Sequence, residues 1–336
     1  MRFDFKLVLA IGMVWFLWGS TFAGMHYAVA TIPPFVMAAT RFLVAGTILY
    51  AVCVVRGRAT VTRTGLKHAF ISGAALLLFG NGISAYTVQF LPTGINALLL
   101  SSTPIWMALI GFIWGGERPR GVAVAGMILG LAGLVLLLAP NGRGAPPSWP
   151  ALLAVCGSIA WAFGSIYARR VGKPPDVLLA TALQMLAGGL LLALEALVFG
   201  EWRTFDVHAV SAASLGGLAW LVVFGSVIAY SAYQYTMHAA PTALASTYAY
   251  VNPIVSVALG YVLFGERLTT VQGAASAVVL LGVALMIWPS RPALPGTLPR
   301  GVAPVEVVEC NPASWTIVAC SSSQRSGDTE TSPRNG

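Results

Sequence analysis

Polar side chains recur at helical spacing inside two long apolar stretches of the chain. They are Asn81, Ser84, Tyr86 and Gln89 in the first stretch, and Tyr230, Gln234 and His238 in the second. Residues three or four apart lie on one face of a helix, so Asn81 shares a face with Ser84, and Tyr230 shares one with Gln234 and His238. Polar groups at membrane depth must face protein or water. These faces could line a solute cavity, or they could form interhelical hydrogen bonds worth about 1–2 kcal/mol each.

Further apolar stretches contain aromatic, amide and hydroxyl side chains of the same kind. They are Trp18, Ser101, Trp106, Trp161, Gln184, Tyr248 and Asn252. Ser101 and Asn252 lie just before Pro104 and Pro253, where a proline removes a backbone donor and can kink a helix. An aromatic wall binds flat or apolar groups, so we predict that this set contributes to a cavity. The alternative is ordinary packing.

Arg41 is the only strongly charged side chain deep within an apolar stretch. A buried arginine is costly and has a partner or a function. It could attract the carboxylate of a solute, or it could bind backbone carbonyls and hold helices together. The sequence slightly favours the structural role.

Catalytic and metal-binding patterns are missing from the sequence. Neither G-x-S-x-G nor H-E-x-x-H occurs, the four histidines are scattered, and the four cysteines lack the spacing of metal ligands. There is also no ring of charges or filter-like segment that would indicate a channel. We therefore predict a protein that is not an enzyme and that needs no metal or cofactor.

Composition places these residues in a membrane. Hydrophobic residues make up 57% of the chain and charged residues 9%, whereas soluble proteins average about 25% charged residues. Stretches of about 20 apolar residues cross a bilayer. The predicted ten spans are 7–29, 34–55, 67–90, 93–115, 120–140, 149–168, 176–199, 215–237, 242–264 and 270–288.

The basic residues follow these spans. Lysines and arginines concentrate at the N-terminus and in the loops after spans two, four and six, which lie on one side of the membrane if the count is right. The positive-inside rule then places both termini in the cytoplasm. The formal net charge of +8 is explained by this topology, so nucleic acid is not a predicted partner.

A long segment occurs twice in the sequence. The stretch from Pro92 to Arg118 aligns without a gap with the stretch from Pro241 to Arg267, and both end in Gly-Glu-Arg. Each half then has five spans, and an odd number inserts the second half upside down. Such inverted repeats are the architecture of secondary transporters. The predicted organisation is a first repeat over 1–140, an inverted repeat over 149–288 and a flexible cytoplasmic tail over 289–336.

The glutamates of the two Gly-Glu-Arg sequences have a predicted structural role. Glu117 and Glu266 lie just before spans five and ten. A negative charge is favourable near a helix N-terminus. We predict that each glutamate caps the span that follows it.

The chain resembles the EamA-type members of the drug/metabolite transporter superfamily. The resemblance lies in "FLWGSTF" of span one, Arg41 in "ATRFLVAG" of span two and the paired Pro…Pro…Gly-Glu-Arg segments, and it covers roughly residues 7–288. It implies an all-α fold of ten transmembrane helices, in which two inverted five-helix repeats surround a central cavity. Spans five and ten are then peripheral. The aromatic centre is similar to that of YddG-type amino-acid exporters.

These features predict an exporter in a bacterial-type inner membrane that works by alternating access. The predicted cargo is a small amphipathic metabolite, with an aromatic or other neutral amino acid as the first candidate. A carrier of drugs, cationic aromatic compounds or nucleotide sugars is the alternative on the same fold. The expected partners are this small molecule and the lipid bilayer, and the sequence does not determine the oligomeric state.

Overall fold

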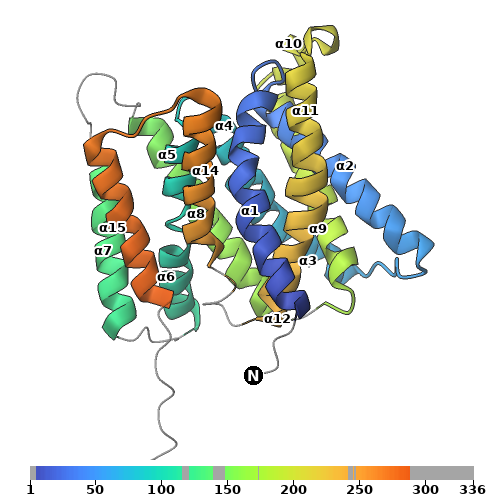
Figure 1. Ribbon diagram of the computed structural model, residues 1–336. Coiled ribbons are helices and arrows are strands. Elements are labelled where there is room, and N and C mark those ends of the chain that lie inside the picture. The colour runs from blue at the N-terminus through green and yellow to red at the C-terminus, as the bar shows by residue number, and fades with distance from the viewer. Residues whose placement is uncertain are drawn as a thin grey trace, which may run out of the picture. The chain divides into compact units, whose positions relative to one another are not determined.

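The computed structural model describes residues 5–115, 121–138, 148–172, 174–240, 245 and 247–287. Helices are the only regular secondary structure in these ranges (Figure 1). Seven helical segments in the described ranges are long and apolar enough to cross a membrane, and three shorter apolar helices accompany them. These segments match the ten predicted spans, so the predicted all-α membrane fold is confirmed. The tail predicted from residue 289 lies outside the described residues.

The first half contains the helices that correspond to spans one to five. They are α1 (Phe5–Ala28), α2 (Pro34–Val55), α3 (Arg63–Gly73), η1 (Ala74–Gly82), α4 (Ile83–Thr87), α5 (Thr93–Leu100), α6 (Thr103–Gly115) and α7 (Gly121–Leu138). Span three is therefore one continuous helical rod made of α3, η1 and α4. Span four is divided into α5 and α6.

The second half contains the helices that correspond to spans six to ten. Its helices are α8 (Ser148–Arg170), α9 (Val177–Val198), α10 (Glu201–Thr204), η2 (Val207–Ala209), α11 (Ala212–Trp220), η3 (Leu221–Ile228), α12 (Ala229–Ala239), α14 (Tyr248–Phe264) and α15 (Thr270–Ile287). Span eight is again one continuous rod, made of α11, η3 and α12. Spans three and eight thus share an unusual feature, because η1 and η3 are both π-helical. Widened turns of this kind are frequent at functional sites.

The break in span four has an identifiable cause. Pro104 has no N–H to donate to the carbonyl of Leu100. The hydroxyl of Thr103 donates to that carbonyl instead, at 2.7 Å. Span four therefore bends at Ser101 and Ser102, in the middle of the membrane-spanning segment. In span nine, Pro253 lies inside α14.

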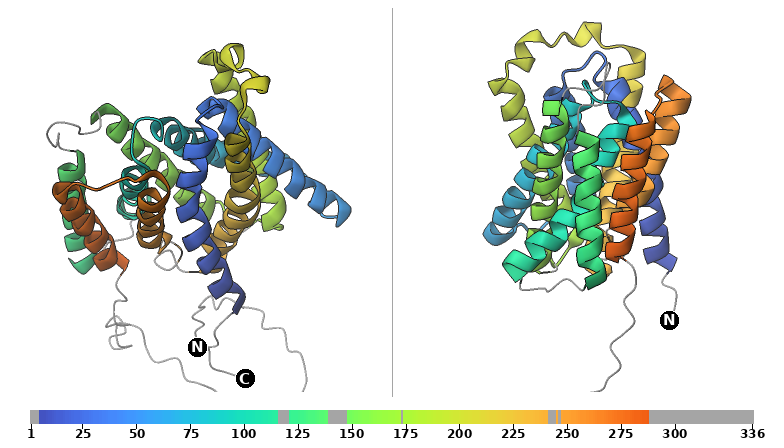
Figure 2. Two further views of the ribbon diagram at one scale, coloured as in Figure 1. Left: turned by 45° about the horizontal axis from the view of Figure 1, so that its top comes forward. Right: turned by 90° about the vertical axis from the view of Figure 1, so that its left-hand side faces the viewer.

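Helices α7 and α15 lie side by side at one edge of the bundle (Figures 1 and 2). Glycines let their backbones approach, since a Cβ on Gly133 would lie 2.8 Å from the backbone nitrogen of Val279. A Cβ on Gly282 would lie 2.7 Å from the carbonyl oxygen of Gly126. This close approach of small residues serves packing of the two helices.

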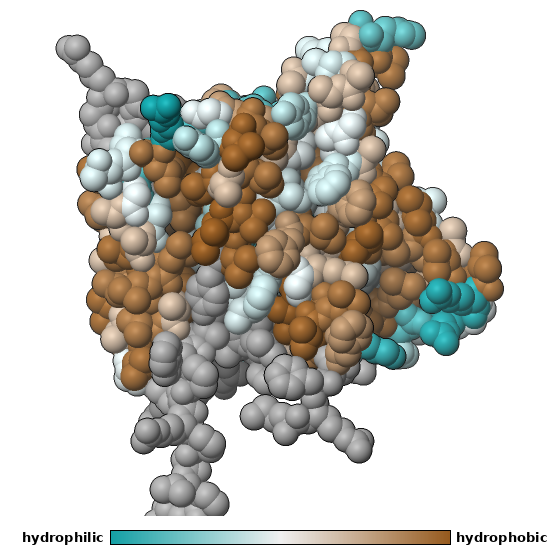
Figure 3. Space-filling model, in the orientation of Figure 1, coloured by the Kyte–Doolittle hydropathy of each residue, from teal (hydrophilic) through white to brown (hydrophobic). Residues whose placement is uncertain are grey.

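Polar side chains gather at the two ends of the bundle, and apolar side chains cover the sides of the face shown in Figure 3. We call the end at which α1 begins and α2 ends the basic end. The described Lys and Arg residues there are Lys6, Arg56, Arg58, Arg63, Lys67, Arg169 and Arg170. We call the other the acidic end; it carries Glu201, Asp206 and Glu266 with Arg203 and Arg267. The described charges therefore follow the asymmetry from which the topology was predicted.

The predicted cap of α15 by Glu266 is wrong. The carboxylate of Glu266 instead accepts hydrogen bonds from the backbone N–H of Thr93 at 2.8 Å and of Gly94 at 3.3 Å. These groups form the N-terminus of α5, a helix of the other half. The N-terminus of α15 is capped by Thr269, whose hydroxyl accepts from the N–H of Gln272. The companion prediction for Glu117 lies outside the described residues.

Candidate functional site

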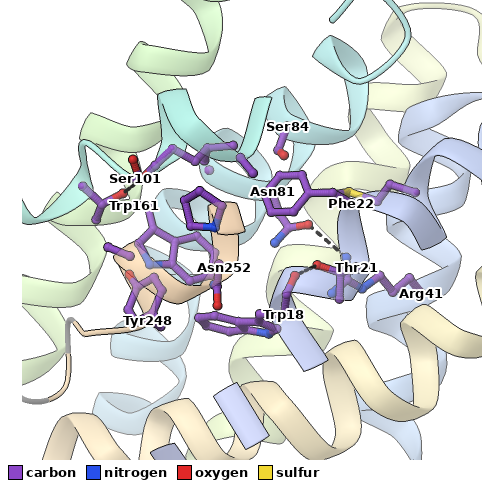
Figure 4. A pocket seen from close by; sticks show the side chains of 17 residues that line it. Trp18, Thr21, Phe22, Arg41, Asn81, Ser84, Ser101, Trp161, Tyr248 and Asn252 are labelled. Carbon is purple, nitrogen blue, oxygen red and sulfur yellow. Dashed lines mark hydrogen bonds between the residues drawn. The ribbon is translucent and has the colours of Figure 1, made fainter. Parts of the chain in front are cut away.

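A cavity of about 80 Å³ lies between the two halves of the described bundle. Its lining comes from α1, α2, η1, α4, α5, α6, α8 and α14 (Figure 4). Its walls are mostly apolar and aromatic, with Phe22 and Met25 on α1 and Trp161 on α8. Its polar groups include Arg41, Asn81 and Ser101. A few ordered waters fit this volume, whereas sites for small organic molecules measure about 300–1,000 Å³.

Arg41 joins the two π-helical segments at the cavity wall. Its Nε donates to the hydroxyl of Ser226 in η3 at 2.7 Å, and its Nη1 donates to Oδ1 of Asn81 in η1 at 3.1 Å. Gly225 makes room for the guanidinium, because a Cβ there would lie 2.9 Å from Nη2. Arg41 is 3% exposed. No described carboxylate lies within ion-pairing distance of it.

Trp18 is the centre of an aromatic cluster beside the cavity. Its ring centroid lies 4.8 Å from that of Tyr233, 5.4 Å from Tyr248 and 5.5 Å from Trp161. Its indole N–H donates to the carbonyl of Gly225 at 3.0 Å. The ring is therefore held in one orientation by a bond to the same π-helical turn that faces Arg41.

Two buried donors of this cluster have no hydrogen-bond partner among the described residues. They are the indole N–H of Trp161 and the hydroxyl of Tyr248, both on residues that line the cavity. Burying a polar group without a partner costs about 1–3 kcal/mol. Asn252 next to them is satisfied when its amide nitrogen is assigned toward the carbonyls of Val14, Trp15 and Tyr248. The side chains of Trp161 and Tyr248 interact with each other and with Tyr233, so these two groups are weakly satisfied.

A second pocket of about 260 Å³ lies at the basic end. We call it the vestibule; its lining includes Thr62, His68, Tyr167, Thr181, Gln184, Gln234 and His238. His68 and Tyr167 are joined there by a hydrogen bond of 2.7 Å between Nδ1 and the hydroxyl. The vestibule is larger than the central cavity.

A thin layer of side chains separates the vestibule from the central cavity. Gln184, at the vestibule wall, accepts hydrogen bonds from the hydroxyl of Tyr230 and from the amide of Gln234. Tyr230 in turn packs against Trp18 at the cavity wall, with 6.2 Å between ring centroids. We call Trp18, Tyr230, Gln184 and Gln234 the septum. All four are less than a tenth exposed.

The structure divides the predicted site residues into three groups. The central cavity is lined by Trp18, Arg41, Asn81, Ser101, Trp161, Tyr248 and Asn252. The vestibule is lined by Gln184, Gln234 and His238, while Tyr230 lies between the two spaces. Tyr230, Gln234 and His238 therefore share one face of α12, as their spacing predicted.

Three predicted residues lie elsewhere. Tyr86 stacks on Phe35 at 5.6 Å, and Gln89 is exposed and bonds the carbonyl of Tyr86. Trp106 donates from its indole to the hydroxyl of Ser102 at 3.1 Å. None of the three is among the residues that line the cavity or the vestibule.

The sequence-based search missed Thr21 and Phe22, which line the cavity, and Ser226, which holds Arg41. Thr21 and Phe22 occur within "FLWGSTF", whose Trp18 was selected, so the helical spacing from Trp18 could have indicated them. Among the described residues, no group of three or more His, Cys, Asp or Glu side chains could hold a metal ion.

Comparison with known proteins identifies the family. The EamA-like transporter family matches the chain twice, over residues 5–139 and over 148–288. The inner membrane transporter YedA of Escherichia coli K12 is 35% identical over 303 residues, which cover 87% of this chain and 96% of YedA. A WAT1-related chloroplast protein of Arabidopsis thaliana is 28% identical over 82% of this chain and 67% of its own length.

A solved crystal structure shares the fold. It superposes with a TM-score of 0.61 at 23% identity, over 83% of this chain and 96% of that one. The two family matches cover most of the chain. The chain is therefore a member of the EamA-like transporter family, within the drug/metabolite transporter superfamily, and an integral membrane transporter.

Proposed function

We propose that this transporter exports small amphipathic metabolites, with aromatic or other neutral amino acids as the first candidates. The observation that carries the proposal is the cavity itself, which is buried between the halves and lined by aromatic rings, amides and hydroxyls around one cation. Aromatic walls accept flat apolar groups of different shapes. The polar groups can orient the head group of such a molecule.

The transport mechanism that fits this geometry is alternating access. The septum separates the central cavity from the vestibule in this conformation. The cavity, at about 80 Å³, is too small for a solute of the size of phenylalanine. Cargo therefore enters in a conformation in which the helices around the cavity move apart. We propose that the two halves are inverted repeats over 1–140 and 149–288, and that they rock around this cavity.

The proposed orientation places the basic end in the cytoplasm of a bacterial-type cell. Seven of the ten described Lys and Arg residues lie at that end, namely Lys6, Arg56, Arg58, Arg63, Lys67, Arg169 and Arg170. This bias supports a cytoplasmic location of both termini. The vestibule then faces the cytoplasm, which is the side from which an exporter loads its cargo.

A nucleotide-sugar carrier on the same fold is less well supported. Phosphate groups are recognised by several charge-assisted hydrogen bonds, commonly from arginine. Arg41 is the single charged residue among those that line the cavity. One guanidinium suits one small anionic group better than a diphosphate.

Flux in proteoliposomes tests the proposed function. Vesicles containing the purified chain are loaded with radiolabelled phenylalanine, tryptophan, leucine or a nucleotide sugar, and efflux is followed against protein-free vesicles. Saturable efflux of at least one amino acid is expected. Efflux of the nucleotide sugar alone would contradict the proposed cargo. Repeating the assay with the proton gradient collapsed shows whether transport is coupled to protons.

A further inference from the structure

The central cavity has an unbalanced charge. Arg41 is the only charged side chain among its lining residues, and no described carboxylate pairs with it. Its two bonded partners, Ser226 and Asn81, are neutral. A buried arginine in a membrane protein ordinarily pairs with an opposite charge or marks a binding site. A negatively charged group on a ligand would complement this guanidinium.

Arg41 and Trp161 bring to the cavity N–H groups that can only donate. Arginine has five N–H donors, and Ser226 and Asn81 engage two of them. Trp161 Nε1 and the hydroxyl of Tyr248 are also buried without a partner among the described residues. A ligand that supplies acceptors would satisfy the N–H groups of Arg41 and Trp161, whereas a ligand that supplies only donors would not. The Tyr248 hydroxyl can donate or accept.

We infer that the cavity recognises a carboxylate on an amphipathic aromatic solute, with Arg41 as the anchor of that carboxylate. This inference rests on the proposed function and narrows it, because it makes the carboxylate the required feature and the amino group dispensable. Arginine binds a carboxylate through two parallel N–H bonds. The ring of the solute then packs against Trp18 and Trp161, which lie 5.5 Å apart by their centroids.

The same arrangement disfavours cationic aromatic compounds. A cation in the cavity would face the guanidinium of Arg41 at low dielectric, without a described acidic side chain to compensate. Aromatic faces attract cations, but the rings here share their cavity with a fixed positive charge. Discrimination between a carboxylate and an ammonium on the same ring is therefore the measurable consequence.

Ligand binding to the purified full-length chain in nanodiscs tests the inference. The probes share a phenyl ring and a chain of similar length: 3-phenylpropionate has the carboxylate alone, phenethylamine the amine alone, and phenylalanine both. Calorimetry or the quenching of tryptophan fluorescence gives the dissociation constants. We expect 3-phenylpropionate and phenylalanine to bind about tenfold or more tightly than phenethylamine. Equal binding of 3-phenylpropionate and phenethylamine would overturn the inference.

Variants separate the anchor from a structural role. Arg41→Gln keeps a donor but removes the charge, so we expect the preference for the carboxylate to disappear. Arg41→Lys keeps the charge but cannot form bidentate hydrogen bonds to a carboxylate, so the preference for the carboxylate should remain but weaken. Arg56→Gln removes an exposed charge at the basic end and should change nothing. If Arg41→Gln does not fold, loss of the preference in Arg41→Lys would still contradict the model of a charged anchor.

Transport measurements distinguish this inference from the proposed function. Binding of 3-phenylpropionate that depends on Arg41 but is not followed by flux of any cargo would refute the transport proposal and leave the anchor intact. Flux of aromatic cargo that is equal with and without a carboxylate would refute the anchor and leave the transporter intact.

Discussion

The hydroxyl of Tyr230 donates a 2.6 Å hydrogen bond to the amide oxygen of Gln184, and the amide nitrogen of Gln234 donates to the same oxygen. One oxygen of α9 thus holds two side chains of α12. Because Tyr230 also packs against Trp18, this oxygen links the vestibule wall to the cavity wall. Gln184 is the member of the septum that bonds two of the others.

Replacing Gln184 by alanine should open the septum. The change leaves the Tyr230 hydroxyl and the Gln234 amide without their acceptor, at a cost of about 1–3 kcal/mol each while they stay buried. The two groups therefore turn toward water, and the vestibule joins the cavity. In a background without native cysteines, Ser101→Cys in the cavity should react severalfold faster with a polar maleimide added from the basic end.

Thr181→Ala is the matched control for this change. Thr181 lines the vestibule on the same helix, and its hydroxyl bonds the carbonyl of Val177 rather than Tyr230. It should leave the labelling rate of the cysteine at 101 unchanged. A rate that rises equally in both variants would show that the septum does not close the cavity.

Trp161 and Tyr86 provide a test of the cavity assignment. Trp161→Phe keeps an aromatic face at the cavity but removes an unpartnered N–H. If cargo accepts from this group, its loss costs about 0.5–1.5 kcal/mol, and the KM for flux should rise about two- to tenfold. Tyr86→Phe, outside the cavity, should leave KM unchanged. A rise in the KM for Tyr86→Phe but not for Trp161→Phe would place the cargo near Tyr86.

The misplacement of Tyr86 and Gln89 has a structural reason. They were selected as polar residues of the same span as Asn81 and Ser84. The π-helical segment η1 carries more residues per turn and ends at Gly82, so the phase of the helix changes there. Helix α4 ends at Thr87, and Gln89 lies beyond it. Local spacing predicted the face of α12 well because the polar residues there follow η3 within one regular helix.

The spans, the basic and acidic ends and the buried Arg41 were predictable because each depends on composition along the chain. The helix that Glu266 caps was not predictable. Glu266 lies next to α15 in the sequence, whereas folding brings the N-terminus of α5 to its carboxylate. The partners of Arg41 were unpredictable for the same reason. Asn81 and Ser226 belong to different halves and meet only through the packing of η1 and η3 around α2.

Glu201 should make stability depend on pH. Its carboxylate lies at the acidic end outside the spans and accepts from the N–H groups of Phe35 and Val36, both at 2.9 Å. Burial raises the pKa of Glu201 above the ordinary 4.5, and these two hydrogen bonds oppose the rise without cancelling it. The folded state therefore binds more protons than the unfolded state just above pH 4.5.

The contribution of Glu201 to the free energy of unfolding is thus fully present below pH 4.5 and is lost as pH rises through the higher pKa of the folded state. Glu201→Gln removes this titration but keeps an oxygen acceptor for α2. The thermal midpoint of the wild type minus that of the variant should fall as pH increases. A difference that stays constant across this range would contradict the raised pKa.

Membrane orientation can be tested with two exposed positions. Thr60 lies at the basic end and His208 at the acidic end, and both side chains are exposed. In a background without native cysteines, His208→Cys should react with an impermeant maleimide in intact cells. Thr60→Cys should react only in inverted vesicles. Labelling of Thr60→Cys in intact cells would reverse the proposed direction of insertion.

Glu266 stabilises the start of α5 from the other half of the chain. Besides the two backbone N–H groups, its carboxylate accepts from the hydroxyl of Thr93 at 2.9 Å. Glu266→Gln removes the negative charge at this helix N-terminus and leaves one oxygen to serve three donors. Because these hydrogen bonds are charge-assisted, we expect a loss of about 1–3 kcal/mol in the free energy of unfolding.

Asp206→Asn is the control at the same end of the molecule. Asp206 also accepts from a backbone N–H, that of His208 at 2.9 Å, but the contact is exposed and within one turn. Its replacement should cost less than about 0.5 kcal/mol. Thermal unfolding in detergent compares the two. Since α5 also lines the cavity through Ala97 and Leu100, Glu266→Gln should lower flux as well. Equal thermal stability of Glu266→Gln and Asp206→Asn would show that the cap does not hold α5.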